Sequence, residues 1–139
     1  MREILFRGKK TVTGEWVEGS LLITNSTLGK LFWIVDGFGV EFGVRAKTIG
    51  QYTGLTDKNG KKVFEGDIVK ENDIVHKEGI QIKGKCSTVS FEKGCWVLLS
   101  NVTWDFLQTN AKAVEIIGNI HDNPDIVEIT DPEIEEQEE

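Results

Sequence analysis

Glycine interrupts the apolar residues of this chain at short intervals, which leaves room for strands but not for long helices. The 139 residues include 15 glycines and two prolines. The apolar runs between them are short and end at turn-forming residues, as LFWIV does at 31–35. Such runs are typical of strands joined by tight turns. The sequence therefore predicts a mainly β fold of antiparallel hairpins forming small barrel-like or sandwich subdomains, with at most one or two short helices.

One internal segment departs from the strand pattern. Elsewhere, short apolar runs between turn residues predict strands at 4–9, 15–23, 31–35, 48–55, 61–64, 67–70, 80–82, 87–91, 95–99 and 113–120. In residues 101–110, Val102, Phe106 and Leu107 recur at helical spacing, and Ser100 or Asn101 is available as a cap. We expect a short helix there.

The C-terminal residues differ in composition from the rest. A chain of this length, 39% apolar, can bury a sufficient core without metal or disulfide, so we expect residues 1–127 to form a single mainly β domain. Residues 128–139 hold seven acidic residues and no basic one. They predict an acidic tail, which the sequence Asp131-Pro132-Glu133 can start as a short helix.

The net charge of −7 comes from that tail, because residues 1–127 carry 16 basic and 16 acidic residues. A neutral body argues against the broad positive field of non-specific nucleic-acid binding. The first ten residues include five charged ones and lack the apolar core of a secretory signal. No charge-free stretch reaches the roughly 18 apolar residues of a membrane span. We expect a cytoplasmic protein with no membrane partner.

The segment QYTGLTDKNGKKVFEGDIVK, at 51–70, predicts a hairpin. Asn59-Gly60 between strand-like runs favours a type I′ turn, in which both central residues have positive φ. That turn places Lys58 opposite Lys61 and Asp57 opposite Lys62. A second turn follows at 65–67, where we expect the Asp67 carboxylate to accept backbone N–H groups.

A calcium loop is the alternative reading of the same segment. Counted from Asp57, the fifth position is Lys61 and the twelfth is Ile68, neither of which is a calcium ligand. The segment also lacks the glycine patterns of phosphate-binding loops. The sequence therefore favours a structural turn and predicts no metal or other cofactor.

The cysteines and histidines are widely separated. Cys86, Cys95, His76 and His121 lack the paired spacing of zinc sites. The two cysteines are offset along one predicted hairpin, beyond disulfide reach, so we expect two free thiols. Cys95-Trp96 matches thiol proteases over two residues only, and those enzymes place the cysteine at the start of a helix, whereas Cys95 begins a predicted strand. We expect no enzyme.

Three stretches together resemble one protein family. They are TIGQYTGLTDKNGKKVFEGDIV at 48–69, EIIGNIHDNPD at 115–125, and ILFRGK at 4–9 followed by GEWVEGSL at 14–21. The chain is similar in them to the YopX family of small proteins from bacteriophages and prophages of Gram-positive bacteria. The resemblance implies a mainly β fold and action inside the host cell. It implies no reaction, because the family offers no catalytic residues to carry over.

Three functional hypotheses follow. The first is a non-enzymatic interaction module that binds a host or phage macromolecule in the host cytoplasm. The alternative is a nucleic-acid-binding accessory protein in which Lys58, Lys61 and Lys62 contact phosphates, although we expect weak or undetectable binding to mixed-sequence DNA at physiological salt. The third is an enzyme with a metal held by Asp57, Glu65 and Asp67.

The sequence also predicts a homodimer whose acidic tail is accessory to the fold. Four tryptophans and seven phenylalanines supply more apolar surface than a thin β domain hides, and a dimer covers such surface and pairs an open strand edge. Light scattering should show a dimer, and a version ending at Val127 should stay folded. A concentration-independent monomer contradicts the dimer, and an unfolded truncation contradicts the accessory tail.

Overall fold

The protein is mainly β, as the sequence predicts. A computed structural model describes residues 2–71, 75–77, 80–82, 86–100 and 104–126. Its strands pair antiparallel throughout the described part. The chain divides into two compact units, Met1–Gly54 and Leu55–Glu139. Folding of residues 1–127 as one cooperative domain stays a prediction.

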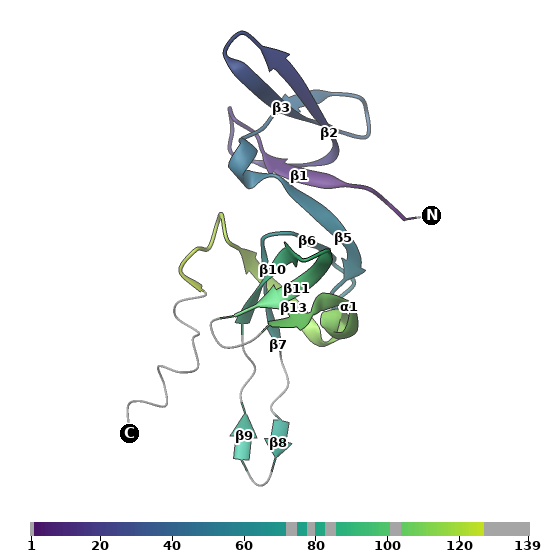
Figure 1. Cartoon of the computed structure of the whole chain (residues 1–139), viewed down its shortest axis with the longest axis vertical. Helices are drawn as coiled ribbons and strands as arrows, with labels where there is room; N and C mark the ends of the chain where they lie inside the picture. The colour runs from purple at the N-terminus through teal and green to yellow at the C-terminus, as the bar shows by residue number, and fades with distance from the viewer. Residues whose placement is uncertain (1, 72–74, 78–79, 83–85, 101–103, 127–139) are drawn as a thin grey trace. The chain divides into compact units, whose positions relative to one another are not determined.

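All strands of the first unit belong to a six-stranded sheet with the order β4-β3-β2-β1-β5-β6. Its strands are β1 (Phe6–Lys9), β2 (Trp16–Ser26), β3 (Gly29–Val35), β4 (Glu41–Gly43), β5 (Gly50–Thr56) and β6 (Lys62–Phe64). Figure 1 shows β2 and β3 as a long hairpin, and a short 3₁₀ helix, η1 (Ala46–Thr48), precedes β5. Ile34 is fully buried, and Gly8 lies against the buried Val44. The end of β5 and all of β6 belong to the second unit.

The second unit contains a five-stranded sheet with the order β12-β11-β10-β7-β13. Its strands are β7 (Asp67–Glu71), β10 (Cys86–Glu92), β11 (Cys95–Leu99), β12 (Trp104–Phe106) and β13 (Val114–Asn119). Two short helices, α1 (Leu107–Asn110) and η2 (Ala111–Ala113), separate β12 from β13, and β8 (Val75–Lys77) pairs with β9 (Ile80–Ile82). None of the described helices is long and apolar enough to cross a membrane.

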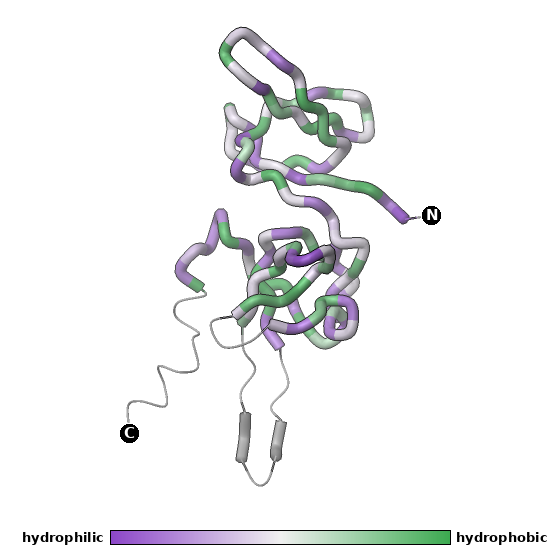
Figure 2. Tube along the Cα trace, in the orientation of Figure 1, coloured by the Kyte–Doolittle hydropathy of each residue, from purple (hydrophilic) through white to green (hydrophobic). Residues whose placement is uncertain are grey.

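The core of the second unit is a cluster of buried apolar side chains from both halves of its sequence. Its members are Val63, Val69, Val89, Leu98, Leu107, Ala111 and Val114. Figure 2 shows hydrophobic and hydrophilic stretches alternating along the strands. This alternation is expected of strands with one buried face.

The helix predicted at 101–110 is confirmed for residues 107–110 and wrong for residues 104–106. Residues 101–103 lie outside the described residues, Trp104–Phe106 forms β12, and helix begins only at Leu107. Pairing with β11 decides the conformation, since Trp104 lies opposite Leu99 and Phe106 opposite Val97. Such cross-strand contacts outweigh a weak local helical pattern. Strands β4 and β8 were not predicted either, and the predicted tail helix lies outside the described residues.

The central hairpin exists, but its turn is not the predicted type I′. The Gly60 N–H donates to the Asp57 carbonyl at 3.0 Å, and the Asp57 N–H donates to the Lys61 carbonyl at 2.8 Å. Gly60 has a φ of +81°, whereas Asn59 is not among the described residues with positive φ. This is a type I turn followed by a glycine bulge. Asp57 therefore lies opposite Lys61 rather than Lys62.

A turn with two positive φ values does occur, between β10 and β11. Lys93 has a φ of 51° and Gly94 one of 81°. Glu92 and Cys95 flank this pair and lie opposite each other in the ladder. A two-residue type I′ loop suits the twist of the strands it joins.

Replacing Gly60 by valine should lower the free energy of unfolding by about 1 to 3 kcal/mol, because a β-branched residue resists positive φ. The urea midpoint measures this. Gly37→Val is the matched control: an added Cβ meets open space at both glycines, but only Gly60 has a φ in the left-handed region. Equal midpoints for the two variants would show that the turn does not need glycine.

Candidate functional site

Asp57 fastens the tip of the central hairpin to β13. Its side chain is 1% exposed. One carboxylate oxygen accepts the N–H groups of Asn59 and Lys61, each at 2.9 Å, and the other accepts the Ile116 N–H at 3.0 Å. The Lys58 N–H adds a bond to the Val114 carbonyl at 3.0 Å. The hairpin and β13, nearly sixty residues apart, are thereby held together.

These bonds also fix the charge state of the Asp57 carboxyl. Burial by itself would raise its pKa, because a charged form is poorly solvated there. The hydrogen bonds from the Ile116, Lys61 and Asn59 backbone, with the positive charge of Lys61, act in the opposite direction and prevail. The pKa of Asp57 therefore lies below its ordinary value, and the side chain is a carboxylate at neutral pH.

The three predicted site lysines are exposed on this hairpin. Lys58 and Lys61 lie in the turn and Lys62 begins β6. The fold adds a fourth base, since the Lys112 ammonium donates to the Thr56 hydroxyl at 2.9 Å. Lys112 belongs to η2, which is distant in sequence, so no local pattern could have found it.

A cavity of about 380 Å³ opens beside the edge strand β12. We call it the β12 groove, and its lining residues are Glu92, Lys93, Cys95, Val97, Leu99, Trp104 and Phe106. The two aromatic rings meet edge to face with their centroids 5.3 Å apart. Trp104 is 58% exposed and Phe106 is 49% exposed.

Strand alternation explains why these residues share one face. Cys95, Val97 and Leu99 occupy alternate positions of β11 and so point to the same side of the sheet. Trp104 and Phe106 lie opposite Leu99 and Val97 and join that side. The groove is thus a largely apolar surface at the edge of a sheet.

Polar groups of the groove stand near the turn between β10 and β11. The Ser90 hydroxyl donates to the Glu92 carboxylate at 2.7 Å. Cys95 is exposed and Cys86 is buried, and both are free thiols, as predicted. Sequence reasoning missed the groove because it assigned Trp104 and Phe106 to a helix. The alternation Trp104-Asp105-Phe106 was the available signal of a strand.

Comparison with known proteins decides the family. The model of the YopX protein family matches residues 5–128.

The chain belongs to the YopX protein family.

Two solved structures are similar to it. Protein EF1440 from Enterococcus faecalis, known from a crystal structure, is 23% identical in sequence to this chain. The two structures align with a TM-score of 0.54 over 91% of this chain and 99% of EF1440. Protein yopX from Bacillus subtilis, also known from a crystal structure, is 15% identical in sequence to this chain. The alignment has a TM-score of 0.54 and covers 91% of this chain and 97% of yopX. At these identities the likeness shows the fold. Curated proteins give no match.

The stretch that most resembles the YopX family, 48–69, forms two turns that are each held by a buried aspartate. Asp57 holds the first turn, as described above. In the second, the Asp67 carboxylate accepts the Phe64 N–H at 2.7 Å, as predicted, and Asp67 is 2% exposed. Two of the three acids of the metal hypothesis, Asp57 and Asp67, thus bind backbone N–H groups. The described residues contain no group of three or more His, Cys, Asp or Glu suited to a metal ion.

Asp57→Asn should lower the free energy of unfolding by about 1 to 3 kcal/mol at pH 7, because an amide NH₂ replaces an acceptor among buried N–H donors. Since folding lowers the pKa of Asp57, its contribution is complete above the unfolded pKa near 3.9 and is lost as the pH falls below it. The stability difference between wild type and variant should therefore narrow in acid, as urea unfolding from pH 7 to about pH 3 would show.

Asp36→Asn is the control for this variant. Asp36 also accepts two backbone N–H groups in a turn, from Phe38 and Val40, but it is only half-buried. Its replacement should cost less than that of Asp57. A larger loss at Asp36, or a difference at Asp57 that widens in acid, would contradict the role assigned to Asp57.

Proposed function

We propose that the protein is a non-enzymatic interaction module of phage or prophage origin that binds another protein through the β12 groove in the host cytoplasm. The observation that carries the proposal is the pair of exposed aromatic side chains, Trp104 and Phe106, beside a cavity at a sheet edge. Exposed aromatic rings of this kind are enriched at protein interfaces. The phage origin and host compartment come from the family resemblance.

The edge of the sheet supports binding by strand addition. β12 is the last strand in the order of the five-stranded sheet and pairs with β11 on one side. An extended segment of a partner can add to such an edge through backbone hydrogen bonds, while its alternate side chains enter a neighbouring pocket. A partner segment that fits this edge and the β12 groove would carry large apolar residues two positions apart in its sequence.

Charge favours a different protein over a second copy at this edge. Asp105, at the centre of β12, is exposed. Antiparallel pairing of two β12 strands about their centre would set two Asp105 residues opposite each other, which destabilises a sheet. The predicted homodimer therefore fits another surface of the chain better, and the occupant proposed for the β12 groove is a segment of a second protein.

The polar groups of the groove suit recognition more than catalysis. General acid–base catalysis needs titratable groups whose pKa values are shifted toward the working pH. Asp57, whose pKa is lowered, has both oxygens bound to backbone N–H groups and lies outside the groove. Glu92 and Lys93 instead add two opposite charges to the lining of a largely apolar cavity.

Affinity capture from host lysate with matched variants tests the proposal. Trp104→Ser with Phe106→Ser removes both exposed rings of the groove and should abolish capture of a partner that the wild type retains. Light scattering of each sample alone separates such a partner from self-association.

Val12→Ser with Phe38→Ser is the control, because both side chains are 94% exposed but belong to the first unit. It should capture the partner as well as the wild type does. Loss with the control variant, or equal capture by the groove variant, would show that the β12 groove is not the binding surface.

A further inference from the structure

Two segments distant in sequence carry five basic residues and no acidic one. Residues 4–14 contain Arg7, Lys9 and Lys10, and residues 42–56 contain Arg45 and Lys47. Residues 1–127 carry equal numbers of basic and acidic residues in total. That total does not show where basic residues gather in the folded chain.

Backbone bonds bring the two segments side by side. An isolated bridge pairs Lys10 with Val44. The Arg45 N–H donates to the Lys9 carbonyl at 2.9 Å, and the Lys9 N–H donates to the Thr48 hydroxyl at 2.8 Å. We call the resulting basic area the β1–η1 surface, with the members Arg7, Lys9, Arg45, Lys47 and the aromatic Trp16; Lys10 points to the other face of β1, over the Phe42 ring.

Trp16 places an aromatic ring among these cations. It lies opposite Lys9 in the pairing of β1 with β2, so the two side chains share one face of the sheet. The Arg7 guanidinium carbon is 4.7 Å from the centroid of the Trp16 ring, and the Lys9 ammonium nitrogen is 5.6 Å from it. Both distances fit cation–π contacts. Trp16 as a whole residue is half-buried.

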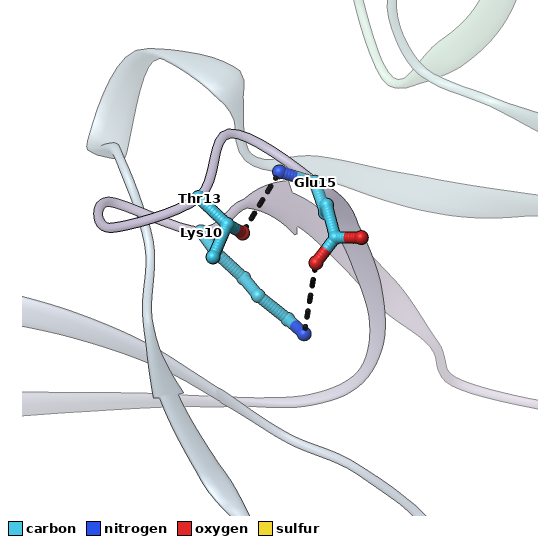
Figure 3. A network of polar contacts seen from close by, with 3 residues as sticks. All are labelled: Lys10, Thr13 and Glu15. Carbon is cyan, nitrogen blue, oxygen red and sulfur yellow. Dashed lines mark hydrogen bonds and ion pairs between the residues drawn. The ribbon is translucent and has the colours of Figure 1, made fainter.

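Acidic residues lie close to Lys10 and Arg7. The Lys10 ammonium is 3.9 Å from the Glu15 carboxylate (Figure 3). The Glu15 N–H donates to the Thr13 hydroxyl at 3.2 Å. Glu18 lies opposite Arg7 across the sheet. Arg45 and Lys47 are exposed. Glu18 is thus one acid beside the four basic residues of the β1–η1 surface, while Lys10 and Glu15 form a pair of their own.

We propose that the β1–η1 surface binds single-stranded nucleic acid. Arginine and lysine side chains contact phosphates, and an accessible aromatic ring stacks on a base, which is the combination that single-strand binders use. The surface differs from the lysine hairpin in combining its cations with an aromatic ring at measured contact distances. It is independent of the β12 groove, so either proposal can fail without the other.

The test measures binding of a fluorescein-labelled oligothymidylate to the full chain by anisotropy at several salt concentrations. Arg45→Ala with Lys47→Ala should flatten the slope of log K against log salt by about 1.4, because each single-strand phosphate contact contributes about 0.7. Lys30→Ala with Lys70→Ala removes two exposed lysines elsewhere and should leave the slope unchanged.

A second pair of variants tests the base contact. Trp16→Leu should weaken oligothymidylate binding about tenfold, as loss of one stacked base implies, and Trp16→Phe should restore most of it. Neither should alter binding to heparin, a polyanion without bases. If Trp16→Phe restores oligothymidylate binding, the loss in Trp16→Leu comes from the missing aromatic ring and not from unfolding of the protein.

Four results would overturn the proposal. The first is that oligothymidylate does not bind at low salt, and the second is that the two double variants give equal slopes. The third is that heparin and oligothymidylate bind equally well and Trp16→Leu changes neither. The fourth is that binding is lost instead when Lys58, Lys61 and Lys62 are replaced by alanine. The third result would indicate a surface for acidic proteins or other polyanions. The last would move the nucleic-acid contact to the central hairpin.

Discussion

The buried carboxylate of Asp57 is the contact on which the second unit most depends. It accepts hydrogen bonds from three backbone N–H groups, those of Asn59 and Lys61 at the hairpin turn and that of Ile116 in β13. Val63, on the hairpin, and Val114, at the start of β13, are both fully buried in the same core. Burial of one face of each strand already restricts the register of a sheet. The Asp57 carboxylate adds directional contacts to fixed donors, so it reinforces the pairing of the hairpin with β13.

A second turn determines which residues face the β12 groove. The type I′ loop at Lys93-Gly94 sets the pairing of β10 with β11, so that Val89 lies opposite Leu98 within the core. The alternate residues Cys95, Val97 and Leu99 then line the groove. A slip of one residue would exchange these two sets. One strand thus supplies both the core and the proposed binding surface.

The sequence predicts most of what depends on local pattern and misses what depends on distant contacts. Short apolar runs and turn residues were enough for the fold class, and the stretch at 48–69 for the family. The turn type at Asn59-Gly60 was wrong for a local reason, because Asp57 at the first position and Gly60 at the fourth favour a type I turn with a glycine bulge over the type I′ turn that Asn-Gly suggests. The groove was missed because pairing with β11 overrides the helical spacing of residues 101–110. The β1–η1 surface needs two segments that only backbone pairing brings together.

Amide hydrogen exchange at Ile116 tests most directly whether Asp57 holds β13 to the hairpin. If its N–H is bound to the buried carboxylate, it should exchange as slowly as core amides such as that of Leu98, through cooperative opening of the second unit. The Lys61 amide, bound to the same carboxylate, should follow it. Fast exchange at Ile116 and Lys61, at rates typical of exposed turns while Leu98 stays protected, would contradict the account.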